Sequence, residues 1–172
     1  VAWGDYDSDG DPDILVSHFE GEYNTLYRND GNGRFTDITA SANLVEPSLP
    51  YVGFGANFFD YDNDADLDLF VANGHVYPQI DQAGSGSSYA QVDHLFANNN
   101  DGTFHLWPNT DLADTARVSR GSCTIDYDND GDIDLFVAHL NRRPSLLRND
   151  GGNRKNWLGI ALVGKTSNKD GI

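Results

Sequence analysis

The sequence predicts an all-β protein made of repeated four-stranded antiparallel sheets. A nine-residue acidic segment occurs three times, at residues 5–13, 60–68 and 126–134. A short apolar run follows each copy, and helical periodicity of useful length is absent. The copies begin at residues 5, 60 and 126, so they are 55 and 66 residues apart. About 60 residues accommodate four short strands and their turns.

The acidic segment is the candidate functional element of each repeat. Carboxylates occupy positions 1, 3, 5 and 9, and a tight loop turns alternate residues toward one centre. Position 6 requires a residue that tolerates positive φ, and it is Gly10 or Gly131 in two copies but Ala65 in the second. A carboxylate cage with a backbone carbonyl from position 7 suits a hard cation of the Ca²⁺ type. The candidate metal ligands are Asp5, Asp7, Asp9, Asp11, Asp13, Asp60, Asp62, Asp64, Asp66, Asp68, Asp126, Asp128, Asp130, Asp132 and Asp134.

Two alternative interpretations of these segments are weaker. Solvated acidic turns without a metal would place four like charges within nine residues, where they repel one another. An EF-hand loop requires a bidentate Glu at position 12, which here is Val16, Val71 and Val137. We expect about three Ca²⁺ ions, one per loop, in preference to Mg²⁺, which rarely uses an all-protein cage.

The first repeat begins with the end of a strand at residues 1–3. After the loop, residues 14–18 form a strand of nearly continuous apolar character, which is typical of a strand buried on both faces. Residues 24–28 form the third strand. Residues 29–33 read Asn-Asp-Gly-Asn-Gly, a turn sequence that leads into a fourth, alternating strand at residues 34–39.

The second repeat has strands at residues 52–59, 67–73, 94–97 and 103–107. The interval from the loop start to the phenylalanine of the last strand is 30 residues in the first repeat (5 to 35) and 44 in the second (60 to 104), so about 14 residues are inserted. This insertion, at residues 74–89, contains Gly-Ser-Gly-Ser-Ser and is either a flexible surface loop or a binding surface.

The third repeat has strands at residues 121–125, 133–139 and 145–148, followed by the turn at 149–152. The pattern D-x-D-x-D-G-x-x-D between two strands resembles the FG-GAP/VCBS repeats of integrin-like β-propellers. Phe54-Gly55-Ala56 before the second loop resembles the sequence that gives the repeat its name. The resemblance implies blade one at residues 1–46, blade two at 47–115 and blade three at 116–155.

Beyond blade three, residues 156–172 resemble the opening of the ASPIC/UnbV domain, which follows such repeats in cartilage-acidic-protein-like secreted proteins. A propeller needs at least four blades to close. We therefore expect an incomplete propeller with open blade faces and edges, whose missing blades come from sequence outside these residues or from neighbouring copies. The absence of Met from the sequence also indicates a piece of a longer product.

Composition excludes several classes of partner. The formal net charge is −16 with 27 acidic residues, of which the three loops hold 15, so three Ca²⁺ ions would leave about −10. This charge argues against nucleic acid and anionic membranes, and no apolar run approaches the roughly 20 residues of a membrane span. Millimolar calcium outside cells favours an extracellular or cell-surface location. The single Cys123 is expected to be a buried structural residue.

Two functions remain open. The first is a calcium-rigidified extracellular scaffold for adhesion or assembly, which binds a protein partner or itself through open blade edges and is not an enzyme. The second is a carbohydrate-binding or carbohydrate-processing propeller with its site at residues 75–89. His18 and His139 occupy matching places in two repeats, which favours a structural role, and no hydrolase, metalloprotease or phosphate-loop motif is present. Trp3, Trp107 and Trp157 are expected to pack in the core, with sugar stacking as the alternative.

Overall fold

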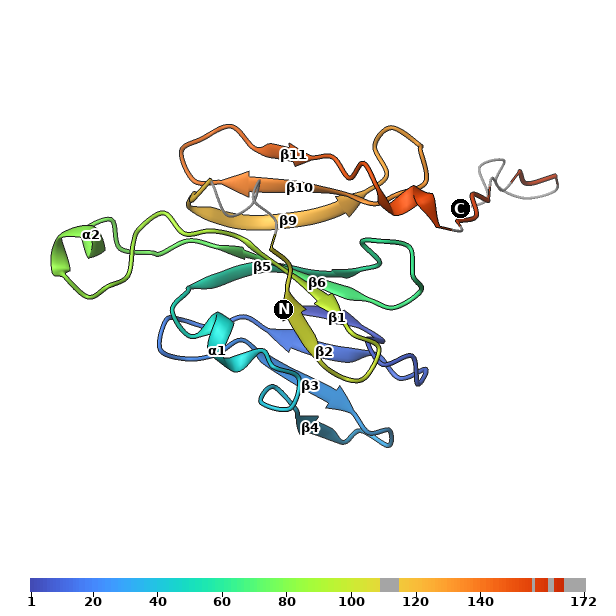
Figure 1. The fold of residues 1–172 in the computed structure, drawn as a ribbon, viewed down its shortest axis with the longest axis horizontal. Coiled ribbons are helices and arrows are strands. Elements are labelled where there is room, and N and C mark those ends of the chain that lie inside the picture. The colour runs from blue at the N-terminus through green and yellow to red at the C-terminus, as the bar shows by residue number, and fades with distance from the viewer. Residues whose placement is uncertain (109–114, 156, 161–162, 166–172) are drawn as a thin grey trace.

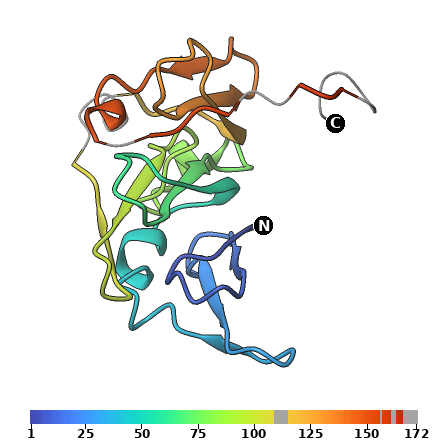
Figure 2. The ribbon, with the colours of Figure 1, turned by 90° about the vertical axis from the view of Figure 1, so that its right-hand side faces the viewer.

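The computed structural model describes residues 1–108, 115–155, 157–160 and 163–165. It consists of three antiparallel sheets stacked side by side in chain order (Figures 1 and 2). Each predicted strand is present, with ends that differ by a few residues. The three sheets do not close into a ring within the described residues, so an all-β blade architecture is confirmed while a complete propeller is not.

The first sheet has the order β1-β2-β3-β4, in which every strand pairs with its neighbour in sequence. Its strands are β1 (Ala2–Gly4), β2 (Asp13–Val16), β3 (Thr25–Asn29) and β4 (Phe35–Asp37). A single-turn helix, α1 (Val45–Ser48), leads to the second sheet. Ser48 ends this turn by donating its hydroxyl to the Leu44 carbonyl at 2.7 Å.

The second sheet repeats this meander with the order β5-β6-β7-β8. Its strands are β5 (Gly53–Phe59), β6 (Asp68–Asn73), β7 (His94–Asn98) and β8 (Phe104–Leu106). The insertion between β6 and β7 carries α2 (Ile80–Ala83) and projects from the end of the sheets opposite the acidic loops, on the left in Figure 1. The acidic loops all lie at the other end, on the right.

The third sheet has three strands among the described residues, in the order β11-β10-β9. They are β9 (Ser119–Ile125), β10 (Asp134–His139) and β11 (Ser145–Leu147), and a 3₁₀ turn, η1 (Gly152–Arg154), follows. The prediction of four strands per blade thus holds for two of the three sheets. The segment predicted to begin the ASPIC/UnbV-like domain lies partly outside the described residues, and its described part forms no strand.

The core lies between the sheets, in two layers. Leu15 and Leu26 of the first sheet pack with Leu69 and Phe96 of the second. Phe70 and Leu95, on the opposite face of the second sheet, pack with Leu135 and Val137 of the third. The predicted burial of the post-loop strand on both faces holds throughout β6, which lies in the middle layer, but β2 and β10 are only partly buried. Burial on both faces therefore depends on having a sheet on each side.

The second and third sheets come into close backbone contact at Gly55. A Cβ on Gly55 of β5 would lie 2.7 Å from the backbone nitrogen of Ser122 and 2.8 Å from the Cα of Gly121, both in β9. No real Cβ tolerates such distances, so this position requires glycine. Gly55 thus allows the backbones of β5 and β9 to come into direct contact. Next to it, the Arg120 guanidinium stacks over the Phe54 ring, 4.1 Å from the ring centroid.

Two sequence expectations about packing are wrong. Cys123 lies in β9 as predicted, but its side chain is exposed. The tryptophans are not core residues, since Trp3 is 78% exposed and Trp157 53% exposed. Cys123 and Trp3 both lie on outer surfaces of the stack, on faces whose equivalents in the second sheet are covered. The residue types favour burial, but whether each side chain is buried depends on whether a neighbouring sheet covers its face.

Candidate metal centres

Each acidic loop joins the first two strands of its sheet, and all three loops have the same backbone path. Position 6 has positive φ as predicted, with 94° at Gly10, 77° at Ala65 and 95° at Gly131. Position 4 also has positive φ, with 59° at Ser8, and 56° and 60° at the equivalent asparagines. Sequence reasoning missed this second turn, although Ser and Asn are residues that such turns favour.

The carboxylate at position 1 closes each loop. Asp5 accepts the backbone N–H of Asp9 at 3.0 Å and that of Gly10 at 2.9 Å. Asp60 accepts the N–H groups of Asp64 and Ala65, both at 3.0 Å. The third loop repeats both bonds, to Asp126, at 3.2 Å. Position 1 therefore orders the loop backbone while its oxygens face the centre of the turn.

The carboxylate at position 9 is buried in every loop, at 0–3% exposure. In the second loop, Asp68 accepts the backbone N–H of Tyr61 at 2.7 Å and that of Asn98 at 2.9 Å. Asp13 and Asp134 make the equivalent pairs of bonds. Position 9 thus ties the start of the loop to the turn after the third strand.

Three carboxylates of each loop converge. Those at positions 1, 3 and 9 each offer an oxygen, and these oxygens lie within 4.8 Å of one another in every loop. The groups are Asp5, Asp7 and Asp13; Asp60, Asp62 and Asp68; and Asp126, Asp128 and Asp134. An arrangement of this kind, repeated three times, can hold a divalent cation between oxygen ligands.

The predicted ligands at positions 5 and 7 lie outside these groups. The carboxylate at position 5 turns back to accept the N–H of position 7, at 2.9 Å from Asp9 to Asp11 and 3.2 Å from Asp64 to Asp66. The third loop has the same bond from Asp130 to Asp132 at 3.3 Å. The metal-ligand role of these six side chains, Asp9, Asp11, Asp64, Asp66, Asp130 and Asp132, remains a prediction.

Burial and mutual repulsion disfavour the ionised form of several loop carboxylates. Burial, together with the Asp64 carboxyl group, raises the pKa of Asp66 to about 7. Burial raises the pKa of Asp68 to about 6, against the opposing effect of its two backbone N–H donors. Burial and the neighbouring Asp9 charge also raise the pKa of Asp7. A bound cation would remove this cost.

The second loop contains oxygens that the protein leaves unsatisfied. Asp62 Oδ1 and Asp66 Oδ1 are buried and have no hydrogen-bond partner. Buried polar atoms without partners are rare in folded proteins because each costs free energy. The Lys155 ammonium lies 3.0 Å from Asp62 Oδ2 and 3.4 Å from Asp64 Oδ2. The Lys155 ammonium therefore already forms ion pairs with this loop. Asp62 Oδ1 has no hydrogen-bond partner and remains available to a cation.

Sequence reasoning missed the role of an asparagine that ends the third strand of the first two sheets and lies just after the third strand of the last sheet. In addition to its backbone bond to position 9, Asn98 donates its side-chain amide to the Tyr6 carbonyl of the preceding loop at 2.9 Å. Asn149 makes the same bond to the Tyr61 carbonyl at 2.6 Å. Asn29, in the first sheet, donates to the Pro12 carbonyl of its own loop, as Asn98 and Asn149 also do at the equivalent position of their loops. The recurrence of Asn at the start of all three turns was the available signal.

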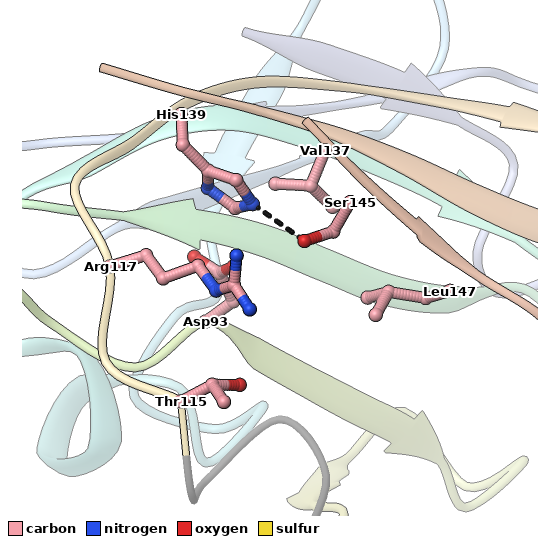
Figure 3. Close-up of a pocket in the computed structure, with 7 residues that line it drawn as sticks. All are labelled: Asp93, Thr115, Arg117, Val137, His139, Ser145 and Leu147. Carbon is pink, nitrogen blue, oxygen red and sulfur yellow. Dashed lines mark hydrogen bonds between the residues drawn. The ribbon is translucent and has the colours of Figure 1, made fainter. Parts of the chain in front are cut away.

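The two histidines at matching places in their sheets contact hydroxyl groups of neighbouring strands. His139 contacts Ser119 at 3.0 Å and Ser145 at 2.9 Å, and His18 contacts Thr25 at 3.3 Å in the matching place of the first sheet. Figure 3 shows His139 and Ser145 beside Asp93 and Arg117, around a cavity of about 30 Å³. Such a volume holds on the order of one water molecule and is far too small for a sugar ring.

The insertion borders a shallow hollow of about 210 Å³, which Gln91 and Ser87 help to line. The Gln91 side chain is already engaged, because it accepts the Val52 N–H at 2.9 Å and contacts the Ser87 hydroxyl at 3.3 Å. His75 is buried at the base of the insertion, 3.2 Å from Glu20. These contacts fix the insertion to the sheets and give the carbohydrate interpretation no support.

Consecutive antiparallel sheets, each with an acidic loop between its first two strands, define a repeat protein of the propeller-blade class. Residues 2–71 and 83–137 match the family described as FG-GAP-like repeat. Since these residues make up most of the chain, the protein belongs to the FG-GAP-like repeat family, and the resemblance drawn from its loops is confirmed.

The chain is also similar to proteins named Cartilage acidic protein 1. It is 26% identical over 166 residues to the Xenopus tropicalis protein, which covers 93% of this chain and 24% of that protein. It is 28% identical over 171 residues to the mouse and human proteins, again over 93% of this chain. The chain thus spans about a quarter of the length of these relatives. No helix in the described part of the chain has the length and hydropathy of a membrane span.

Proposed function

We propose that this chain is a calcium-ordered extracellular scaffold module of an adhesion or assembly protein, without enzymatic activity. Each acidic loop binds one Ca²⁺ through its carboxylates at positions 1, 3 and 9. The observation that carries the proposal is the convergence of these carboxylate oxygens within 4.8 Å in all three loops. When bound, the ion supplies the positive charge that the loop lacks.

The magnitude of the repulsion supports a cation in each loop. Two unit charges 4.8 Å apart repel by about 3 kcal/mol at an effective dielectric constant of 20. Three such pairs per loop, in three loops, exceed the roughly 5–15 kcal/mol by which a domain is stable. The loop must therefore either bind protons, as the raised pKa of Asp68 indicates, or bind a cation.

The proposed extracellular location fits the same requirement. Calcium modules of this kind outside cells operate at dissociation constants of about 10⁻⁴–10⁻³ M, which intracellular calcium does not reach. Membership of the FG-GAP-like repeat family and the similarity to Cartilage acidic protein 1 are consistent with a scaffold. The partner is another protein or another copy of the chain, bound through the open blade faces, and glycan, nucleic acid and membrane insertion have no support.

Scanning calorimetry with and without a calcium chelator tests the proposal. Each site occupied at 100 times its Kd adds about 2.7 kcal/mol to the free energy of unfolding, so calcium raises Tm substantially. Mg²⁺ at the same concentration serves as the ion control. In the matched control variant, Asp7→Asn, Asp62→Asn and Asp128→Asn together remove position 3 from every loop. A wild-type Tm that is identical in calcium and in chelator would refute the proposal.

A further inference from the structure

Lys155 occupies a place where the third repeat departs from the other two. The residue six positions after the turn asparagine is Phe35 in the first sheet and Phe104 in the second, but Lys155 in the third. Phe104 is buried, and its ring packs against Tyr6 of the preceding loop with 5.7 Å between the ring centroids. The third sheet thus carries an ammonium group where the second carries an aromatic ring.

This ammonium group contacts the second acidic loop. Lys155 Nζ lies 3.0 Å from Asp62 Oδ2 and 3.4 Å from Asp64 Oδ2, and these are its only ion pairs in the described part of the chain. Asp62 is one of the three residues of this loop whose carboxylate oxygens converge. Its other oxygen, Oδ1, is buried and has no hydrogen-bond partner. The lysine and a cation bound in the loop would therefore share one carboxylate.

The first and third loops have a different arrangement of positive charge. An arginine precedes the turn asparagine in these two sheets, and each arginine pairs with an aspartate of its own turn. Arg28 lies 2.8 Å from Asp30, and Arg148 contacts Asp150 and lies 3.8 Å from Asp128 of the loop. The turn aspartate balances the charge of each arginine, whereas the charge of Lys155 is balanced by the second loop alone.

Packing on either side of Lys155 also holds it at the loop. A Cβ on Gly152 would lie 2.7 Å from the Tyr61 carbonyl oxygen of the second loop, so the backbone there is in direct contact with that loop. A Cβ on Gly131 of the third loop would collide with the Trp157 ring. Residues 152–157 therefore lie across the second and third loops, and this placement brings the Lys155 ammonium to Asp62.

We propose that Lys155 is a built-in counter-ion of the second loop that competes with calcium. A divalent cation that enters between the carboxylates of this loop meets a like charge and takes over the carboxylates that the ammonium pairs with. The second loop therefore binds calcium more weakly than the first and third loops. Occupancy of this loop displaces the ammonium and, by linkage, loosens the hold of residues 152–157 on the loops. This inference rests on the proposed calcium-binding function and adds a residue that sets the affinity of one site.

Calorimetric titration of Lys155→Gln with calcium tests the inference. One of the three sites should bind about tenfold more tightly, because a neighbouring positive charge is removed, while the other two sites stay unchanged. A wild type that binds only two ions should gain a third in this variant. Arg154→Gln is the matched control, since it removes one charge from the adjacent position, and the Arg154 side chain forms no ion pair in the described residues. This control should change no affinity by more than about twofold, as expected for a solvent-screened charge.

A second variant assigns the effect to the second loop. Asp62→Asn removes a converging carboxylate from this loop and should abolish its binding while leaving the other two sites. Adding Lys155→Gln to Asp62→Asn should then have no effect on calcium affinity. A tightening that persists in the double variant would overturn the inference, because Lys155 would then act on another loop.

Displacement of the ammonium has a readout that does not depend on measured affinities. An N-hydroxysuccinimide ester acylates the wild-type chain, and mass spectrometry gives the rate at Lys155 relative to Lys165, which forms no ion pair in the described part of the chain. Through a calcium titration, this ratio should stay constant while the two tighter sites fill and rise severalfold as the weakest site fills. Folding cannot produce this pattern, because the first two ions already order the chain.

The inference is overturned if Lys155→Gln leaves all calcium affinities unchanged, or if the acylation ratio does not rise as the last site fills. Either result with three occupied sites leaves the proposed function intact and contradicts the role of Lys155 alone. A wild type that binds no calcium at any loop instead refutes the proposed function, and the inference falls with it.

Discussion

Ala65 illustrates how single residues shape the acidic loops. It occupies position 6 of the second loop with φ 77°, where the other two loops have glycine. A left-handed conformation costs an L-residue roughly 1 kcal/mol or more. Its N–H nevertheless donates to Asp60 at 3.0 Å, as glycine does in the first loop. The loop geometry thus overrides the local preference of the residue.

We expect Ala65→Gly to stabilise the chain by about 1 kcal/mol, because the strain at positive φ is relieved. The reciprocal change, Gly10→Ala, introduces the same strain into the first loop, where a Cβ meets no atom within 4 Å, and should destabilise by a similar amount. Urea unfolding in saturating calcium measures both. Destabilisation by Ala65→Gly would contradict this account.

Asp93 gives the fold a titratable group outside the loops. It accepts the Asn73 N–H at 2.8 Å and the Ser119 hydroxyl at 3.0 Å, yet burial raises its pKa to about 6. A carboxyl group whose pKa is higher in the folded state than in the unfolded state binds more protons when folded. Its contribution to stability is therefore complete below about pH 4 and is lost as the pH rises through about 6.

The variant Asp93→Asn should remove this pH dependence. As the pH rises from about 3 to about 7, the free energy of unfolding of the variant should gain about 3 kcal/mol on that of the wild type, since one pKa unit corresponds to about 1.4 kcal/mol. Chemical denaturation in saturating calcium at several pH values measures the difference. A difference between the two proteins that stays constant across this range would show that Asp93 titrates normally.

At the scale of elements, the turn after the third strand links successive blades. Asn98, at the end of β7, donates its backbone N–H to Asp68 in the loop of its own sheet. Its side-chain amide donates to the Tyr6 carbonyl in the preceding loop. The same amide also donates to the Leu67 carbonyl at 3.1 Å. One residue therefore fixes the position of two acidic loops relative to each other.

We expect Asn98→Ala to lower the free energy of unfolding by about 1–3 kcal/mol, because one buried and one partly buried carbonyl lose their donor. Asn99→Ala is the matched control. Its side chain bonds to Thr103 within the same exposed turn, and the change should cost no more than about 0.5 kcal/mol. Thermal unfolding of both variants in calcium gives the comparison, and equal losses would contradict the inter-blade role of Asn98.

At the scale of the whole molecule, the charge of −16 is concentrated at one end of the sheets, where the three acidic loops lie side by side (Figure 1). The opposite end carries the insertion with α2. The acidic end therefore lies opposite an end that is ordered by hydrogen bonds such as those of Gln91. Without a metal, the repulsion among the carboxylates of all three loops destabilises the folded protein.

Salt should therefore stabilise the metal-free chain far more than the calcium-loaded chain. Raising the ionic strength from 0.01 to 1 M shortens the Debye length from about 30 Å to about 3 Å, which screens repulsion between the loops. Tm measured in chelator should rise over this range, whereas Tm in saturating calcium should change little. A metal-free Tm that is independent of salt would contradict the electrostatic account of the loops.

Much of the fold could be predicted because the same local sequence features, an acidic loop followed by an apolar strand and a turn, occur three times. Alternating and continuous apolar runs located the strands, and turn residues such as those at 29–33 located the hairpins. The carboxylates at positions 1, 3, 5 and 9 of each loop were predicted to converge, and those at positions 1, 3 and 9 do. The carboxylate at position 5 instead accepts the backbone N–H of position 7. The positive φ at position 4 and the turn asparagines were missed, because their roles depend on partners in other parts of the loop and the sheet.

The sequence by itself determined the strands, their order and the acidic loops, because these depend on residues close together in the chain. Only the tertiary structure decided which faces are covered. Phe70 and Phe136 occupy the same position after their loops, yet one is fully buried and the other is 39% exposed. The physical reason is that burial depends on the sheet packed opposite, which lies far away in sequence and is absent beyond the third blade in the described residues.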